Sequence, residues 1–278
     1  MTGAMFERVG IAGLGLIGTS FGLALRARGL AGRVIGVDRD AAAITVARGR
    51  GAVDEGAADY AVLEGADLVI VAVPPQAVVD AALRAAGPAR RGAVLFDVAS
   101  VKAPIVRALE AALPEGVRFV GGHPMAGTER QGAAAADAAL LTGRPFLITP
   151  TARSDADAVD VVWNLARGLG MRPLLLDPDV HDAIVAQVSH VPYLLAAAAV
   201  NAADDVALGL GGPAFESLRR MAGSPVELWV EICSQNRSAI LRSLGWVRDE
   251  LDRLEAALNE DALGGLLAAA RRRAGGGG

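Results

Sequence analysis

Short apolar runs rich in valine, isoleucine and leucine recur through the first half of the chain. Each run is followed by an alanine-rich stretch whose apolar positions have helical spacing. Because the runs are apolar at successive positions, they are typical of parallel strands that helices cover on both faces. The strands predicted from this pattern are 9–12, 34–37, 68–73, 94–98, 119–120, 146–149 and 172–176. The first half is therefore predicted to be α/β, with a doubly wound parallel sheet.

The pattern changes after Asp177-Pro178, where long helical periodicities replace the strand-like runs. Helices are predicted over 181–203, 215–221, 226–257 and 263–273. Their excess of leucine and alanine predicts that a second copy of the chain covers part of them, as in a homodimer, although a self-contained bundle fits the residues equally well. We therefore predict two domains, residues 1–176 with the sheet and residues 177–278 all-helical.

Composition narrows the class of partner. The 278 residues are 53% hydrophobic and carry a formal net charge of −4, so they offer no basic field for nucleic acid or an anionic membrane. A small-molecule ligand is expected instead. The single cysteine, Cys233, cannot form an intrachain disulfide, which agrees with a reducing cytoplasm. The apolar stretch 191–200 is shorter than the roughly 20 residues of a membrane helix, and we expect no span.

A glycine-rich turn joins the first predicted strand to the first predicted helix. It reads Gly13-Leu14-Gly15-Leu16-Ile17-Gly18. The first glycine permits the tight turn, the second leaves room for a pyrophosphate, and the third lets the helix pack close to the strand. The positive end of the helix dipole and its free N–H groups would bind the phosphates. This context predicts a Rossmann-type dinucleotide-binding domain in residues 1–176.

The end of the second strand bears on the choice of nucleotide. Asp38 would accept hydrogen bonds from the adenosine ribose and repel a 2′-phosphate, so NAD is the expected cofactor. Its neighbour Arg39 could pair with that phosphate instead, which keeps NADP open. Val73-Pro74-Pro75 ends the third predicted strand, where a stiff loop would pass near the adenine and ribose; a simple strand terminator is the competing interpretation.

Two polar segments follow the next two predicted strands, Asp97 to Lys102 and Gly121 to Glu129. Ligands of open parallel sheets bind outside the carboxyl ends of the strands, so both segments are predicted to face the nicotinamide. Lys102 is the only lysine in the chain, which suggests that a compact ammonium matters at this position. No metal site is predicted.

At these residues the chain resembles the prephenate/arogenate dehydrogenase family. The specific element is His123-Pro124-Met125-Ala126-Gly127-Thr128-Glu129, and the resemblance continues through nearly the whole length. The other matching segments are the glycine turn with 19–25, residues 97–102, His181-Asp182, 189–192, Leu228-Trp229 and Asn236-Arg237. The resemblance implies an oxidative decarboxylation in tyrosine biosynthesis, in which hydride passes to NAD and the ring carboxylate leaves as carbon dioxide.

The resemblance also implies roles for individual residues. His123, as a neutral imidazole, would accept or polarise the proton of the 4-hydroxyl, and Ser100 would hydrogen-bond the hydroxyl and the nicotinamide. The substrate carries two carboxylates, or one carboxylate and an amino acid group, so cations should line its pocket. The substrate-binding candidates are Thr128, Glu129, Arg130, His190, Tyr193, Arg237 and Lys102.

Two positions depart from members that prefer prephenate. Those members carry a second histidine three residues after His190 and an arginine directly after the tryptophan, where this chain has Tyr193 and Val230. Tyr193 offers a neutral hydroxyl. We therefore expect arogenate, or both compounds, rather than prephenate alone.

Two other functions compete with this one. Another NAD(P)-dependent hydroxy-acid dehydrogenase or an imine reductase could use the same nucleotide fold, but such enzymes commonly rely on a lysine in the helical half, where this chain has none. A non-catalytic dinucleotide-sensing module is the alternative from another class, and it would not need Ser100 or His123 beside the nicotinamide.

Overall fold

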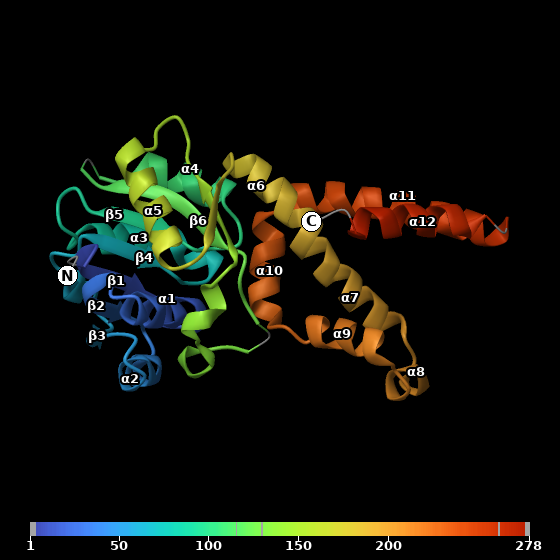
Figure 1. Ribbon diagram of the computed structural model, residues 1–278, viewed down its shortest axis with the longest axis horizontal. Helices are drawn as coiled ribbons and strands as arrows, with labels where there is room; N and C mark the ends of the chain where they lie inside the picture. Colours follow the sequence, from blue (N-terminus) through green and yellow to red (C-terminus); the bar gives the residue numbers. More distant parts are fainter. Residues whose placement is uncertain (1–3, 115, 129, 261, 276–278) are drawn as a thin grey trace.

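A computed structural model describes residues 4–114, 116–128, 130–260 and 262–275 of the chain. A sheet covered by helices forms one half and a group of helices forms the other (Figure 1). The last strand ends at Leu175 and the first helix of the second half begins at Pro178, with Asp177 capping that helix.

The described residues form one eight-stranded sheet in the order β3-β2-β1-β4-β5-β6-β7-β8. The chain runs outward from β1 to β3 and then returns to β4 beside β1, which creates a switch point between their carboxyl ends. Open α/β sheets bind ligands at such a point. The strands are β1 Phe6–Ala12, β2 Ala31–Val37, β3 Glu55–Ala57, β4 Leu68–Val71, β5 Val94–Asp97, β6 Arg118–Pro124, β7 Pro145–Thr149 and β8 Arg172–Leu175.

Helices cover both faces of the sheet, which confirms the predicted α/β class. On β4, Leu68 and Ile70 join one apolar cluster while Val69 and Val71 join the other. This two-sided burial explains the unbroken apolar run. The helices are α1 Leu16–Ala27, α2 Ala41–Gly49, α3 Val78–Ala86, α4 Ala103–Ala112 and α5 Ala156–Gly168. Helices α1, α2 and α5 contribute to the first cluster, and α3 and α4 to the second.

The sheet differs from the prediction at two strands. The short strand β3, Glu55-Gly56-Ala57, was not predicted because it contains no apolar run. Strand β7 pairs with β6 in the antiparallel direction, so the sheet is mostly and not wholly parallel. The described residues of the connecting segment 125–144 contain no crossover helix, and both ends of the segment lie at the carboxyl edge of β6. Its short turns η3 Ala133–Ala135 and η4 Ala138–Leu141 pack against α1 on one face of the sheet.

The described residues of the second half form helices joined by short connections and contain no strand, as predicted. It consists of α6 Pro178–Val185, the π-helical turn η5 Ala186–His190, α7 Val191–Ala202, α8 Asp205–Gly209, α9 Pro213–Ala222, α10 Val226–Gln235, α11 Arg237–Asn259 and α12 Leu263–Gly275. The expected single helix over 226–257 is wrong, because the chain breaks at Asn236 between α10 and α11. In Figure 1, α11 with α12 forms one arm that projects away from the sheet, and α7 to α9 form another.

Helices α6, η5 and α7 form one continuous helix over Pro178–Ala202. By length and composition this helix could cross a membrane, with a mean hydropathy of 1.6 over its most apolar window. The sequence predicted a helix over 181–203 but judged a membrane span from the apolar stretch 191–200 alone. His181, Asp182 and His190 are buried on this helix, and a core helix of a soluble protein passes the same test.

Candidate active site

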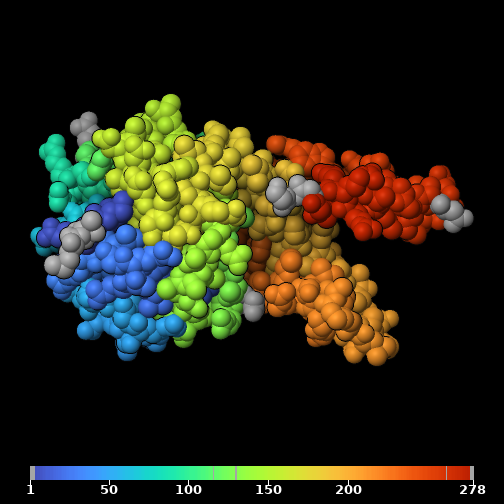
Figure 2. Space-filling view, in the orientation of Figure 1, coloured from blue at the N-terminus to red at the C-terminus, as the bar shows by residue number. Residues whose placement is uncertain are grey.

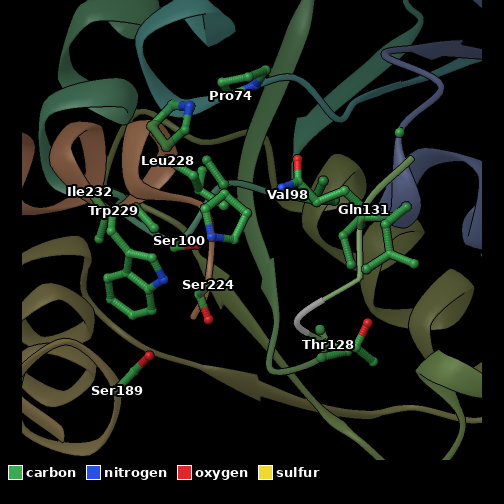
Figure 3. A pocket seen from close by; sticks show the side chains of 18 of the residues that line it. Pro74, Val98, Ser100, Thr128, Gln131, Ser189, Ser224, Leu228, Trp229 and Ile232 are labelled. Atoms are coloured by element: carbon green, nitrogen blue, oxygen red, sulfur yellow. The ribbon is translucent and has the colours of Figure 1, made fainter. Parts of the chain in front are cut away.

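A cavity of about 710 Å³ lies between the carboxyl ends of the strands and the helical half. In the space-filling view a recess separates the two halves (Figure 2). Figure 3 shows Leu228 and Trp229 of α10 on one side of the cavity, Thr128 and Gln131 on the other, and Ser100 between them. Both halves of the chain therefore supply its walls.

The glycine turn forms the nucleotide end of the cavity. Gly15, Leu16 and Ile17 line it. Gly13 has a φ of +97°, and a Cβ there would lie 2.3 Å from the Ala72 carbonyl oxygen; at Gly18 a Cβ would lie 1.9 Å from the Gly13 oxygen. These two glycines are therefore required by the turn itself. A Cβ on Gly15 would meet no described atom within 4 Å, so this position faces open space that a pyrophosphate can fill.

Helix α1 presents an anion-binding end to that space. Its N-cap is Gly15, which has no side chain to cap the first turn. The first N–H groups of a helix have no partner inside the helix, so those of α1 can donate to phosphates. Val73, Pro74 and Pro75 continue the wall beyond the turn, and the Gln76 N–H donates to Glu231 of α10 at 3.3 Å, tying this loop to the helical half.

Asp38 lies at the end of β2, and the cavity lining does not include it or Arg39. The Asp38 carboxylate accepts hydrogen bonds from the N–H groups of Leu14 at 2.7 Å and Asp40 at 2.9 Å. It thereby fixes the glycine turn. Each carboxylate oxygen can accept a second hydrogen bond, so Asp38 keeps the capacity to bind the ribose. Ribose binding by Asp38 stays a prediction. Arg39 is exposed.

Ser100, just after β5, and His123, in β6, border the cavity as predicted. The His123 ring is connected to two further side chains, to which the sequence prediction gave no catalytic role. Its Nδ1 lies 2.9 Å from Nε2 of His181, and Nδ1 of His181 lies 2.8 Å from Oδ1 of Asp182. The same carboxylate accepts the backbone N–H groups of Lys102 at 2.7 Å and Ala103 at 3.0 Å, at the start of α4.

This chain of contacts determines where the protons lie. The Asp182 carboxylate only accepts, so His181 must donate from Nδ1 and, when neutral, keeps a lone pair on Nε2. His123 then donates from Nδ1, and its Nε2 carries the free lone pair. Burial holds the pKa of His123 well below its usual value, and the neighbouring His181 and Lys102 lower it further. Burial also lowers the pKa of His181, against the opposing effect of Asp182. At neutral pH His123 is therefore an unprotonated base.

The surroundings of Lys102 do not suit a residue that binds the substrate. Its side chain is fully buried, pairs with Asp97, and donates to the Gly122 carbonyl oxygen at 2.8 Å. Burial lowers the pKa of Lys102, and the attraction of Asp97 opposes that shift. The predicted substrate contact is corrected: the buried ammonium joins β5 to β6, and Lys102 is not part of the cavity lining.

The other substrate-binding candidates divide into two groups. Thr128, Arg130 and His190 line the cavity, whereas Tyr193 and Arg237 are outside its lining. Arg237 is exposed at the start of α11. Tyr193 stacks flat on Trp229, with ring centroids 3.7 Å apart and planes 1° from parallel, so it supports the indole from behind. Glu129 lies outside the described residues.

His190 is a neutral side chain and not the cation that was expected. Burial lowers its pKa to about 4, against the opposing effect of Asp182. Cations come instead from Arg144, beside β7, and Arg220 of α9, both in the cavity lining. The sequence prediction missed these two. Ser217, Arg220 and Met221 recur at helical spacing, which was an available signal for a face of α9 that meets a ligand.

Comparison with known protein families identifies both halves of the chain. The model of the prephenate dehydrogenase nucleotide-binding domain matches residues 21–175, and that of the prephenate dehydrogenase dimerization domain matches residues 177–271. The chain belongs to the prephenate dehydrogenase family. The predicted family is therefore confirmed.

Individual members of the prephenate dehydrogenase family match over nearly the full chain. Prephenate dehydrogenase of Bacillus subtilis is 29% identical over 92% of this chain and 71% of its own length. Cyclohexadienyl dehydrogenase of Zymomonas mobilis is 30% identical over 91% and 89%, respectively. Among solved structures, prephenate dehydrogenase of A. aeolicus, in complex with hydroxyphenyl propionate and NAD+, has a TM-score of 0.87 at 27% identity, covering 96% of each chain.

A second solved relative is named for arogenate. Synechocystis arogenate dehydrogenase has a TM-score of 0.80 at 31% identity and covers 97% of this chain and 98% of its own. A hydroxyisobutyrate dehydrogenase from Mycobacterium tuberculosis is only 18% identical with a TM-score of 0.55, and shares the fold alone.

Proposed function

We propose that this protein is an NAD-dependent dehydrogenase that oxidatively decarboxylates prephenate, arogenate or both, in tyrosine biosynthesis. The observation that carries the proposal is the His123 ring. It borders the same cavity as Ser100 and the glycine turn, and its contact with His181 leaves Nε2 free to accept a proton. Membership of the prephenate dehydrogenase family supports the substrate class.

The glycine turn fits a dinucleotide. The open space at Gly15 and the uncapped start of α1 are suited to the pyrophosphate. Asp38 would bind the ribose, and Val73 to Pro75 would pass along the adenosine side. When bound, NAD supplies the acceptor for the hydride. The A. aeolicus relative was solved with NAD+, and the exposed Arg39 makes NADP the alternative that an assay must include.

In the proposed reaction the 4-hydroxyl proton moves to Nε2 of His123 as the hydride leaves the ring carbon that bears the hydroxyl. The bond from the ring to its carboxylate then breaks, and carbon dioxide leaves. The electron pair of that bond enters the ring, which becomes aromatic, and the oxygen takes the proton back from His123 as a phenol. The proton is thus returned, and none is released overall.

Ser100, His181 and Asp182 would assist this step without exchanging atoms with the substrate. Ser100 lines the same cavity as His123 and would orient the hydroxyl beside the nicotinamide. Nε2 of His181 holds the His123 ring by its contact with Nδ1 of His123. The Asp182 carboxylate, bonded to His181, would stabilise the positive charge that appears on His123 when it takes the proton.

Anionic groups of the substrate would meet the arginines of the cavity, Arg130, Arg144 and Arg220. Thr128 adds a hydroxyl to the lining of the same cavity. The preference for arogenate or for both compounds stays a prediction. Of the two positions that motivated it, Tyr193 lies behind Trp229 and Val230 is 61% exposed.

We also propose that the protein is a cytoplasmic homodimer. The buried cluster of the helical half contains only Ala186, Val191 and Ile240 among the described residues. Large apolar side chains stay exposed along the α11 arm, including Leu241 at 52%, Trp246 at 53% and Leu258 at 63%. A second copy would cover them, and sedimentation velocity measures the mass directly.

The reaction is tested by following the NADH absorbance with purified protein. Prephenate and arogenate are each supplied with NAD and with NADP, in four parallel assays. The proposal predicts reduced cofactor with at least one substrate and faster reduction of NAD than of NADP. Absence of reduced cofactor in all four assays, from protein that binds NAD, would contradict the proposed function.

A further inference from the structure

The chain contains three histidines, and His190 is the one that the proposed reaction does not use. Its side chain is 1% exposed and borders the cavity. Within the described residues, its Nε2 is buried with no hydrogen-bond partner. A buried polar atom without a partner is costly, so such an atom beside a cavity indicates a group that arrives with the ligand.

The neighbouring Asn236 determines which kind of group this is. Its Nδ2 donates to the carbonyl oxygen of Asp182 at 2.8 Å, and this contact identifies the atom as the amide nitrogen because a carbonyl oxygen only accepts. The same nitrogen lies 3.2 Å from Nδ1 of His190. Nδ1 must therefore accept, and in the neutral ring the hydrogen is carried by Nε2, the atom that has no partner.

The backbone places these two side chains together at two irregular points. His190 is the last residue of the π-helical turn η5, and Asn236 occupies the break between α10 and α11, with φ −103° and ψ 25°. Trp229 holds the other side of the imidazole, edge to face, with centroids 6.0 Å apart. Single-turn π-helices are frequent at functional sites, and here the turn ends on a side chain that borders the cavity.

We propose that His190 donates a hydrogen bond from Nε2 to a carboxylate oxygen of the substrate, and that Asn236 is the positioning residue that holds His190 in this tautomer. This inference rests on the proposed function. A carboxylate is the group chosen because the same cavity contains Arg130, Arg144 and Arg220, which suit an anionic ligand. The substrate has two sources of that oxygen, the ring carboxylate and the side-chain carboxylate, and the test separates them.

The tautomer is tested by nuclear magnetic resonance of protein labelled with ¹⁵N-histidine, in which only three imidazoles contribute signals. A His190→Gln sample assigns the signals of residue 190. The proposal predicts a neutral ring with hydrogen on Nε2. It also predicts that Asn236→Asp, whose carboxylate cannot donate, moves the hydrogen to Nδ1 or charges the ring. A wild-type ring with hydrogen on Nδ1, or an imidazolium, would overturn the proposal.

The substrate contact is tested with two variants of similar side-chain size. His190→Phe removes the hydrogen-bond donor, and His190→Gln retains one. His190→Phe should raise KM about tenfold or more, the scale for losing a hydrogen bond to a charged group. NAD affinity should be unchanged, and His190→Gln should recover part of the loss. Ser234→Ala, an exposed position on α10, is the control. A folded His190→Phe variant with wild-type KM would show a purely structural role and refute the contact.

Binding of hydroxyphenyl propionate to the NAD complex distinguishes the two carboxylates, because this compound has the side-chain carboxylate and lacks the ring carboxylate. If His190→Phe raises the dissociation constant of this compound by the same factor as it raises KM, the contact is with the side-chain carboxylate. A raised KM with unchanged binding assigns it to the ring. Because NADH formation by the wild-type protein is measured separately, failure of the proposed function is distinguished from failure of this inference.

Discussion

The Asp182 carboxylate allows one consistent arrangement of the hydrogens on His181 and His123, and that arrangement makes His123 a base. The sequence identified His123 through its flanking motif, because those residues follow a predicted strand. It did not assign catalytic roles to His181 and Asp182, which lie 58 and 59 positions away along the chain. These residues meet His123 only when α6 packs beside the sheet. Sequence spacing carries no information about such a contact.

Replacing the proposed base tests its role at the level of a single side chain. His123→Asn should lower kcat by about 100-fold or more, the usual scale for a general base, because an amide accepts a proton poorly. NAD binding should persist, since the glycine turn is untouched. Titration with NAD and steady-state kinetics measure the two effects. Loss of NAD binding with the activity would show that His123 supports the fold and is not the base.

The pH dependence follows from the direction of the pKa shift. The unprotonated form of His123 is the active one, and burial, followed by His181 and Lys102, lowers the pKa of this ring well below the usual value of 6.5. The active form therefore persists as the pH falls through 6.5, and kcat/KM should decline only at more acidic pH. A profile of kcat/KM against pH measures this. An acidic limb centred near 6.5 that disappears in His123→Asn would contradict the buried, low-pKa base.

At the scale of elements, the predictions succeeded where apolar runs were long and failed where contacts between elements decided the structure. Strand β4 is buried on both faces and was predicted, but β3 is a three-residue edge strand without an apolar run. The antiparallel direction of β7 depends on where segment 125–144 packs. The break at Asn236 depends on its buried contacts with Asp182 and His190, since the local helical pattern continues through it.

The glycine turn offers a matched pair of substitutions. Gly15→Val should leave the melting temperature near that of the wild type, because its Cβ meets no described atom within 4 Å, and should weaken NAD binding by about tenfold or more by occupying the pyrophosphate space. Gly18→Ala should lower stability by about 1–3 kcal/mol or more, because its Cβ would overlap the Gly13 carbonyl oxygen.

Thermal unfolding and NAD titration measure both variants of the turn. The two variants should differ. Gly15→Val should weaken NAD binding without a loss of stability, whereas Gly18→Ala should lower stability first. If Gly15→Val bound NAD as tightly as the wild type, the pyrophosphate would have to lie elsewhere.

At the scale of the whole molecule, the sequence predicted a sheet half and a helical half, but not how the two halves are oriented relative to each other. The cavity takes Ser100 and His123 from the sheet half and His190 and Arg220 from the helical half. Arg220 was missed, while Arg237 was predicted to bind the substrate and is exposed. The sequence of a helix does not show which of its arginines will face a cavity. The division at residues 176 and 177 stays a prediction as a domain boundary, and it falls where strands give way to helices.

The central claim is that hydride transfer and loss of carbon dioxide occur in one reaction. The most direct test supplies prephenate or arogenate labelled with ¹³C in the ring carboxylate and measures labelled carbon dioxide and NADH in the same sample. Our account predicts one molecule of labelled carbon dioxide for each NADH. NADH formed without labelled carbon dioxide would instead indicate a simple hydroxyl dehydrogenase and contradict the account.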